Sequence, residues 1–335
     1  VTMQPFRALV SDMVPDTQRN KGYSVQSFLI NAGAVLGSML PFILTYIGVA
    51  NEPAPGNKVA PTVIWSFYLG GAALLGTVLW TSFKTKEYPP DEYKKYNNIP
   101  EDTGPRKSFW KLVLTMPKTM MQLAVTQFFS WFALFLMWVY TTNAIAGKIW
   151  GVKQDELKKA QDTIASKAAV ANLDQLKMIV ANFNEAGNWT GVIFAAYSLF
   201  AALYSLILPK LAEKYGRRTT YAFSLMMGGI GLISMLFISD KYLLFIPMIG
   251  IGMSWAAILA MPYAILSSSL PPEQTGVYMG IFNATITIPQ IVAGFFGGIL
   301  LLALGGQAIS IIALAGCSMA VAGILAKVVI TSEGH

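Results

Sequence analysis

The sequence predicts an all-α membrane protein whose helices cross the bilayer. Of its 335 residues, 54% are hydrophobic and only 12% are charged, and the mean hydropathy is +0.52. Soluble domains carry about 25% charged residues, so about half of the usual charge is missing. The chain also contains eight mostly apolar runs of the length that a spanning helix requires. This composition argues against a cytosolic enzyme and against a protein that binds nucleic acid.

None of the eight runs follows a basic segment at the start of the chain, and each is longer than the apolar core of a signal peptide. A cleaved targeting peptide is therefore a poor explanation for these runs. They cover Ser24 to Ala50, Val63 to Phe83, Met120 to Thr142, Thr190 to Pro209, Thr219 to Ser239, Tyr242 to Ser269, Val277 to Leu304 and Ile309 to Ile330. Before them, residues 1–14 begin with Val1 and have the pattern of the end of a further helix. We therefore expect the sequence to be a fragment that lacks the earlier helices of its first bundle.

The positions of lysine and arginine set the expected orientation in the membrane. The stretch Lys84 to Lys118 holds eight such residues, Lys210 to Arg218 holds four, and Asp16 to Gly22 holds two. We expect these three basic loops to be cytoplasmic. Alternation of the spans then places the other loops on the opposite side: Asn51 to Pro61, Thr142 to Asn188 and Asp240 to Lys241.

A charged stretch between the second and third runs predicts two bundles. Residues Glu87 to Arg106 hold four prolines among mixed charges, which is typical of an irregular linker. We expect residues 1–83 to be the remainder of an N-terminal bundle and 84–118 to be a cytoplasmic linker. Residues 119–335 would form a C-terminal bundle of six helices, with an extracytoplasmic insertion at 143–188.

The insertion contains apolar residues at a spacing of three and four, which predicts an amphipathic helix. These residues are Leu173, Leu176, Val180 and Phe183. A helix that caps the outer face is one interpretation, and a role in substrate selection is the other.

Glycines and prolines inside the runs predict close helix contacts and kinks. Gly33 with Gly37, and Gly294 with Gly298, form GxxxG pairs that allow helix backbones to approach. Four prolines lie within the runs, where they would kink helices for gating or for structural reasons. They are Pro41, Pro247, Pro262 and Pro289.

The residues of common enzyme sites are missing. The one histidine is His335 and the one cysteine is Cys317, which argues against hydrolase triads, metal centres built on these residues and an internal disulfide. No Walker A or HExxH motif occurs, which argues against ATP-driven transport and metalloproteolysis. We expect a protein that is not an enzyme and that uses no cofactor or metal.

Arg7 and Asp12 are the ionisable residues of the first helix, and such groups are costly at membrane depth. Five positions separate them, so they project about 140° apart and do not form a simple pair on one face. Asp12 is the one carboxylate that we place within the membrane, which favours a role in proton coupling. The alternative is an interfacial acid, because Pro15 and Asp16 follow closely.

Uncharged polar and aromatic side chains on the other runs could line a site for a neutral polyol. They are Gln26, Asn31, Gln127, Trp131, Tyr140, Tyr263, Asn283 and Gln290. Hydrogen bonding between helices is the alternative for each of them. The turn LAEKYGRR, Leu211 to Arg218, offers Arg217 and Arg218 to helix ends and to an acid such as Glu213. It would form a cytoplasmic gate, or it would serve topology alone.

Several of these segments resemble a known family. The turn LAEKYGRR is similar to the cytoplasmic loop motif of the major facilitator superfamily. The segment PFRALVSDM, Pro5 to Met13, resembles the fourth helix of proton-coupled sucrose transporters of plants, their animal sugar-transporting relatives and bacterial homologues. Gln127 to Thr142 resembles their seventh helix, and Gly276 to Gln290 resembles their eleventh.

The resemblance implies a major facilitator fold of two helical bundles, with the first three to four of its twelve helices absent here. It also implies that Arg7 and Asp12 match a functional pair on the fourth helix. The sequence departs from the family at Thr142 and Asn143, where relatives often carry an acid near an aromatic residue and a glycine.

We therefore expect proton-coupled symport of a disaccharide or related glycoside, such as sucrose or maltose, by alternating access. The partners would be the sugar, protons and the lipid bilayer. The protein would act as a monomer in the cell membrane, which is the inner membrane in a Gram-negative bacterium. The alternatives are a membrane sugar sensor or scaffold without transport, and a facilitator for a non-sugar solute.

Overall fold

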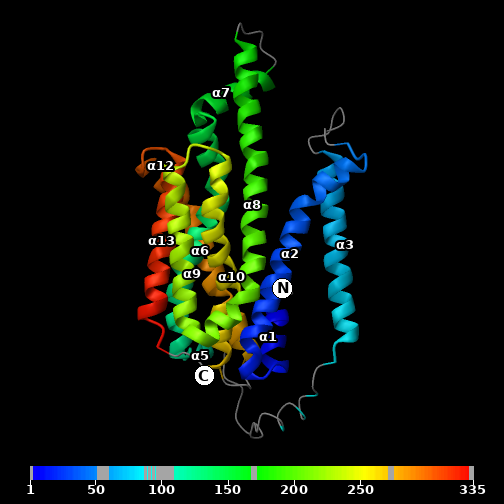
Figure 1. Ribbon diagram of the computed structural model, residues 1–335, viewed down its shortest axis with the longest axis vertical. Helices are drawn as coiled ribbons and strands as arrows, with labels where there is room; N and C mark the ends of the chain where they lie inside the picture. Colours follow the sequence, from blue (N-terminus) through cyan, green and yellow to red (C-terminus); the bar gives the residue numbers. More distant parts are fainter. Residues whose placement is uncertain are drawn as a thin grey trace.

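The computed structural model describes residues 3–50, 60–86, 109–166, 172–270 and 275–331, together with positions 89, 92 and 95. Throughout these residues the regular structure is helical (Figure 1). The α-helices are α1 (Met3–Met13), α2 (Arg19–Tyr46), α3 (Pro61–Lys84), α5 (Phe109–Leu114), α6 (Lys118–Ile149), α7 (Gln154–Ala165), α8 (Leu173–Tyr215), α9 (Arg217–Ser234), α10 (Phe245–Ser267), α11 (Thr275–Phe282), α12 (Ala284–Ala303) and α13 (Ala308–Val328). Short 3₁₀ helices are η1 (Asp16–Gln18), η2 (Met235–Phe237) and η3 (Tyr242–Leu244).

Eight helical segments of the described chain are long and apolar enough to cross a membrane, and they correspond to the eight predicted runs. The all-α membrane architecture predicted from the sequence is therefore confirmed. Most of the expected linker, most of the loop at 51–61 and His335 lie outside the described residues.

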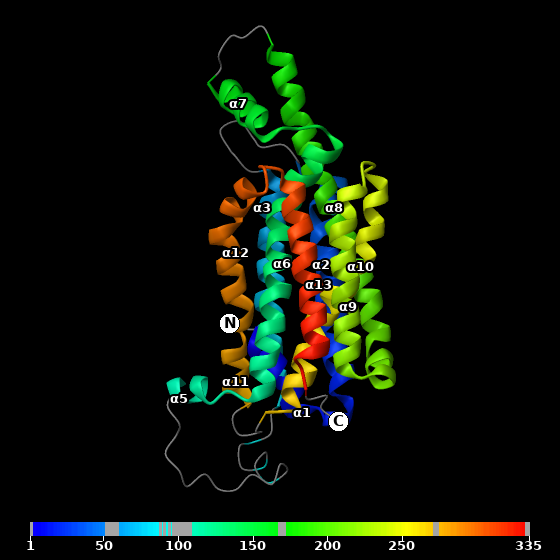
Figure 2. The same cartoon turned by 90° about the vertical axis from the view of Figure 1, so that its left-hand side faces the viewer.

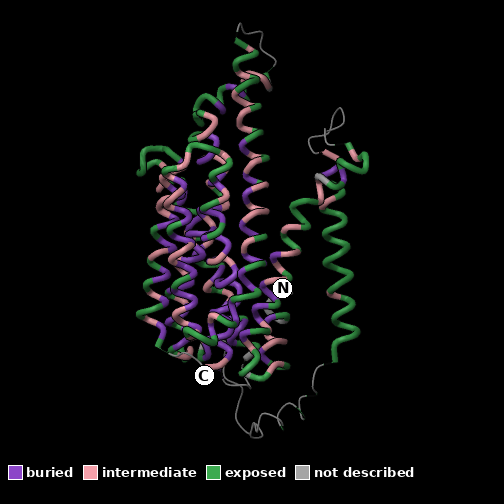
Figure 3. The backbone as a smooth tube through the Cα atoms, viewed as in Figure 1, coloured by how far each residue is buried: buried purple, intermediate pink, exposed green. Residues whose placement is uncertain are grey.

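The helices form two groups. The α6–α13 bundle is closely packed, with α13 against α6 and α9, and α10 against α8 and α9. The α1–α3 group joins it through α2, which packs on α8 and α10, and through α1, which packs on α11. Helix α3 stands apart and is mostly exposed (Figure 3). In Figure 1, α2 lies along α8 at the lower end and diverges from it toward the upper end. The two groups therefore meet at one end of the molecule.

The predicted basic loops lie at this same end. The turn between α1 and α2, the turn between α8 and α9, and helix α5 are all found at the lower end in Figures 1 and 2. The α6–α7 connection and the turn before α10 lie at the opposite end. This arrangement is the alternation that the distribution of lysine and arginine predicts.

Helix α8 is longer than the sequence indicated. We expected a separate amphipathic helix around Leu173 to Phe183 and a span from Thr190, but both belong to one helix of 43 residues. At 1.5 Å per residue it extends about 65 Å, about twice the thickness of a hydrocarbon core. The first turns of α8 therefore project beyond the bundle, where α7 packs on them (Figure 2).

Small residues allow the central helices to touch, but these residues are not the glycines of the predicted GxxxG pairs. A Cβ atom at Gly229 would lie 2.8 Å from the carbonyl oxygen of Gly316, and one at Gly250 would clash with the carbonyl oxygen of Met227. By contrast, no described atom lies within 4 Å of a Cβ built at Gly33, Gly37 or Gly298, and Gly294 meets the ring of Phe135 at 3.7 Å. The GxxxG prediction is therefore wrong for the contacts between described helices.

The prolines also differ in effect. Pro41, Pro262 and Pro289 lie inside α2, α10 and α12, where each removes a backbone donor. Pro247 is the third residue of α10, in the first turn, where no intrahelical bond is lost. The prediction of a mid-span kink at Pro247 is therefore wrong.

Candidate transport site

Arg7 is buried where α1 meets α10. Its side chain is 1% exposed, its Nη1 donates to the carbonyl oxygen of Leu259 at 2.5 Å, and its guanidinium carbon lies 3.8 Å from the centre of the Tyr263 ring. Pro262 lies between these two residues and removes a backbone donor from the same stretch of α10. Arg7 therefore connects the two groups of helices through a carbonyl group and an aromatic face.

Two tyrosines complete the surroundings of Arg7. The Tyr23 hydroxyl donates to the backbone carbonyl of Arg7 at 3.4 Å, and the Tyr23 and Tyr263 rings lie 6.0 Å apart. The Tyr263 hydroxyl is buried and makes no hydrogen bond, and the same holds for Nε of Arg7. These two polar atoms are costly to bury unless another group reaches them during the protein's activity.

Asp12 lies near the C-terminal end of α1 and is exposed, whereas Arg7 in the middle of the helix is buried. Their separation of five positions predicts that the two side chains lie on different faces of the helix. Asp12 also takes part in an interaction within the described residues.

Gln26 and Asn31 are buried on α2, and their amide groups bond to nearby backbone. Gln26 Nε2 donates to the carbonyl of Phe6 at 2.8 Å, and Asn31 Nδ2 donates to the carbonyl of Ser27 at 2.7 Å. The amide oxygens of both residues remain buried without a hydrogen-bond partner. Next to them, the Ser27 hydroxyl donates to the carbonyl of Ala256 at 3.3 Å and accepts from Ser205 at 2.9 Å. This face of α2 therefore forms a polar contact with α8 and α10.

Three tryptophans form a cluster in the α6–α13 bundle. Trp131 and Trp138 lie on one face of α6, and both meet Trp255 of α10 edge to face, at 5.7 and 5.6 Å between ring centres. The Trp138 indole donates to the Tyr197 hydroxyl at 3.3 Å, but the buried Trp131 indole N–H has no partner. The cluster therefore offers aromatic faces and one unused donor.

Gln127 lies one turn before Trp131 on the same face of α6. Its Oε1 accepts from the Tyr221 hydroxyl at 3.3 Å, whereas its buried Nε2 makes no hydrogen bond. Two predicted residues, Gln127 and Trp131, thus carry unused donors one helical turn apart.

Of three other predicted residues, Tyr140 and Gln290 lie at the contact between α6 and α12, and Asn283 lies between α11 and α12. Tyr140 packs on α12, where a Cβ at Gly297 would lie 2.8 Å from its hydroxyl. Gln290 lines an open cavity of about 420 Å³, together with Phe135, Thr287, Ile291, Gly294 and Phe295. Asn283 is half-buried at the break between α11 and α12, where its N–H is shared between the carbonyls of Met279 and Gly280, at 3.2 Å each. These residues are not described as contacting the tryptophan cluster.

Arg217, which we expected in a cytoplasmic gate, bonds to an amide, a carbonyl and a hydroxyl. Its Nε donates to Asn20 Oδ1 at 2.7 Å, and its Nη1 donates to the carbonyl of Ala264 at 3.1 Å and to the Ser268 hydroxyl at 2.6 Å. Gly216, at a φ of 82°, makes the turn that begins α9. Arg217 therefore joins the ends of α9 and α10 to the start of α2.

The other two residues expected in the gate, Arg218 and Glu213, do not join the two groups of helices through the contacts described. Arg218 donates to the carbonyl of Ile330 at 2.9 Å, within the α6–α13 bundle, and Glu213 is exposed. Arg19, which the sequence indicated only as a topological charge, donates to the carbonyls of Ser267 and Ser11, both at 3.1 Å. These arginine contacts go to carbonyl oxygens, an amide and a hydroxyl, which a search for opposite charges does not find.

Sequence reasoning missed Trp138, Trp255 and Ser205 at these contacts. A signal was present for Trp138, which follows Trp131 by seven positions and so shares its face of α6. Trp255 and Ser205 contact the candidate residues from other helices, and that proximity depends on tertiary packing.

Comparison with known proteins agrees with this architecture. Residues 174–334 match the profile of the Major Facilitator Superfamily. The match covers α8 to α13 almost completely, and the all-α architecture with eight apolar helices is consistent with a major facilitator fold. Members of this superfamily are transporters, so the matched region supports membrane transport.

Two curated relatives are also similar to part of the chain. Over 110 residues, it is 27% identical to the tetracycline resistance protein, class H, of Pasteurella multocida, which covers 33% of this chain and 27% of the relative. Over another 110-residue match it is 26% identical to an uncharacterized MFS-type transporter of Methanocaldococcus jannaschii, covering 33% of this chain and 28% of the relative. The chain thus spans little more than a quarter of the length of each relative that it matches.

Proposed function

We propose that the protein is a secondary active transporter that couples proton entry to uptake of a disaccharide or related glycoside. It would work by alternating access, in which two groups of helices close and open around a central site. The proposal extends the superfamily match to a substrate class and an energy source, and it places the protein in the cell membrane as a monomer.

The observation that carries the proposal is the set of arginine contacts between the two groups. Arg7, Arg19 and Arg217 each make hydrogen bonds that join the α1–α2 segment to α10. The contacts with α10 go to backbone carbonyl oxygens, which can be exchanged for water when the groups separate. Toward the other end α2 diverges from α8, so the arrangement is that of a transporter closed at the end with the basic loops (Figure 1).

Support for a sugar comes from the side chains near this contact. A sugar ring packs on aromatic faces and accepts hydrogen bonds through its hydroxyl groups. Trp131 and Gln127 supply unused buried donors, and the tryptophan cluster supplies aromatic faces. No carboxylate is among these groups, which favours a neutral substrate over a cation.

Asp12 and Arg7 are the residues that we propose for proton coupling. Protonation of Asp12 would change the charge of α1 by one unit, and α1 carries Arg7, which contacts α10. A change of charge near the C-terminal end of this short helix can therefore bias the contact that Arg7 makes five residues earlier.

A non-sugar solute is the second candidate. It is favoured by the partial similarity to a protein named for tetracycline resistance and by the apolar walls of the α6–α12 cavity. Counterflow of labelled disaccharide in proteoliposomes of the full-length protein decides between the candidates. Exchange that unlabelled sucrose or maltose inhibits supports the sugar proposal. Saturable sugar binding without exchange supports a sensor, and competition by a hydrophobic drug alone supports the second candidate.

A further inference from the structure

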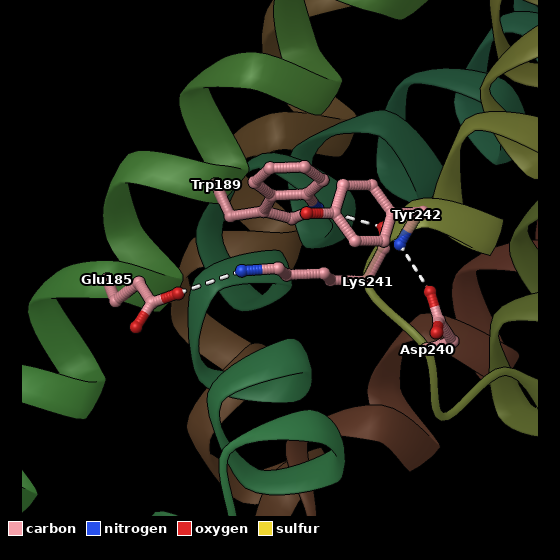
Figure 4. A network of polar contacts seen from close by, with 5 residues as sticks. All are labelled: Glu185, Trp189, Asp240, Lys241 and Tyr242. Atoms are coloured by element: carbon pink, nitrogen blue, oxygen red, sulfur yellow. Dashed lines mark hydrogen bonds and ion pairs between the residues drawn. The ribbon is translucent and has the colours of Figure 1, made fainter.

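The Lys241 ammonium lies among three aromatic rings at the end of the bundle opposite the arginine contacts. Its Nζ is 5.2 Å from the centre of the Trp189 ring, 5.6 Å from that of Tyr242 and 6.0 Å from that of Trp150. It also pairs with Glu185 Oε1 at 3.0 Å (Figure 4). We refer to these five residues as the Lys241 clamp. Each ring face and the carboxylate attract the ammonium, so the contacts act in the same direction.

Backbone contacts hold the lysine in place from the other side. The Trp189 indole donates to the carbonyl of Lys241 at 3.0 Å, and Asp240 Oδ1 accepts from the N–H of Tyr242 at 2.7 Å (Figure 4). The Trp189 and Tyr242 rings meet edge to face at 5.4 Å. The lysine backbone is therefore fixed against the same tryptophan that its ammonium contacts, which reduces the entropy that the clamp must overcome.

The clamp connects three elements at the level where α8 leaves the bundle. Trp150 directly follows α6, Glu185 and Trp189 belong to α8, and Lys241 and Tyr242 lie in the turn before α10. Beyond this level, α8 carries α7, whose Leu157 and Ala160 are buried. We call α7 and residues 173–186 the α7–α8 cap.

Two glycines weaken helix α8 at the level of the clamp. Gly187 and Gly191 lie on either side of Trp189, and no described atom is within 4 Å of a Cβ built at either position. Packing therefore does not require glycine there. Each glycine costs a helix about 0.5–1 kcal/mol relative to alanine. Two such residues within five positions favour bending of α8 at this level, whereas Pro209, which also weakens the helix, lies near its opposite end within the bundle.

We propose that residues 187–191 form a hinge in α8 and that the Lys241 clamp is its latch. With the clamp closed, the cap moves together with the α6–α13 bundle. When Lys241 is released, the cap pivots at the glycines while its own helices stay intact. This inference concerns the cap alone and stands whichever solute the protein carries.

The latch is tested by Lys241→Met, which keeps the aliphatic stem and removes the charge. Spin labels at Gln175→Cys and Ser239→Cys, in a Cys317→Ser background in nanodiscs, report the distance between the cap and the bundle. We expect Lys241→Met to broaden this distance distribution and Lys241→Arg to keep it narrow. Lys327→Met is the matched control, because Lys327 donates only to Thr219 Oγ1, at 2.7 Å, among its described contacts and lies at the opposite end of the bundle. An unchanged distribution in Lys241→Met overturns the latch.

The hinge is tested by hydrogen exchange in the same variants. A pivot predicts that Lys241→Met accelerates exchange about fivefold or more around residues 187–191, while residues 173–183 keep their protection. Adding Gly187→Ala and Gly191→Ala should narrow the distance distribution again. Faster exchange across the whole cap means that the cap unfolds rather than pivots, and it overturns the hinge. Faster exchange throughout α10 would mean that the clamp stabilises the bundle generally, and it overturns the proposal as well.

Discussion

The guanidinium carbon of Arg7 lies over the Tyr263 ring, 3.8 Å from its centre, while the Tyr263 hydroxyl is buried without a hydrogen-bond partner. The ring therefore interacts with Arg7 through its face, and its hydroxyl adds a cost. Substitutions of Tyr263 can therefore separate the contribution of the ring face from the contribution of the hydroxyl to the contact between α1 and α10.

Removing the Tyr263 hydroxyl should leave the contact intact. Tyr263→Phe keeps the aromatic face and removes an unsatisfied buried group, so we expect thermal stability in detergent that is unchanged or slightly higher. Tyr263→Leu loses the cation–π contact of a desolvated guanidinium, which is worth about 2 kcal/mol. We expect it to unfold at a lower temperature. Equal losses in both variants would show that the hydroxyl, rather than the ring face, is what matters.

Because the indole N–H of Trp131 is unused, we expect substitutions of Trp131 and Trp138 to differ in their effects on sugar affinity and stability. Replacing Trp131 by Phe removes a donor that no described protein group uses, so we expect weaker sugar affinity and a smaller loss of stability than in Trp138→Phe. Loss of one hydrogen bond to the substrate corresponds to about a tenfold rise in the KM of counterflow. Trp138→Phe is the matched change, because the Trp138 N–H bonds to Tyr197. It should lower stability more than affinity, and the reverse pattern would remove Trp131 from the proposed site.

Asp12→Asn should uncouple transport from protons. Asparagine keeps the shape and hydrogen-bonding capacity of the side chain but fixes it in a neutral state. We expect accumulation against a gradient to be lost, while exchange of sugar for sugar, which needs no net proton release, survives at least in part. Asp174→Asn in the cap is the control. Accumulation by Asp12→Asn with an unchanged pH optimum would make Asp12 a structural interfacial acid.

The Lys241 clamp predicts a defined pH dependence for the order of the cap. The hydrogen bond from Lys241 lowers the pKa of Glu185 below 4.5, and the same bond raises the pKa of Lys241 above 10.5. The carboxylate contribution is present above pH 4.5 and is lost as the pH falls through the lowered pKa. The lysine contribution is present below pH 10.5 and is lost as the pH rises through the raised pKa.

The spin-label distance between cap and bundle should therefore be constant between about pH 6 and 9 and broaden in acid. Because both side chains are partly exposed, about 1 M salt should weaken the clamp at every pH. Broadening centred near neutral pH would indicate another titrating group.

The spans could be predicted from sequence because lipid contact requires local apolar runs. Each run is helical, although the run from Val277 to Leu304 is divided at Asn283 into α11 and α12. The continuity of α8 could not be predicted, since the polar residues between Phe183 and Thr190 look like a loop unless the cap is known to support them. Arg217 was identified by its turn motif, but its acceptors Asn20 and the Ala264 carbonyl come from distant parts of the chain. Carbonyl acceptors carry no signal in a sequence. For the same reason, the hydrogen bond from Arg7 to the carbonyl of Leu259 could not be predicted.

The central claim is proton-driven sugar transport, and accumulation in proteoliposomes tests it most directly. The full-length protein is reconstituted, a pH gradient acid outside is imposed, and uptake of labelled disaccharide is followed with and without a protonophore. The account predicts accumulation above the external concentration that collapses when the protonophore is added. Equilibration of the sugar without accumulation, or no sugar entry while the protein still binds sugar, would contradict it.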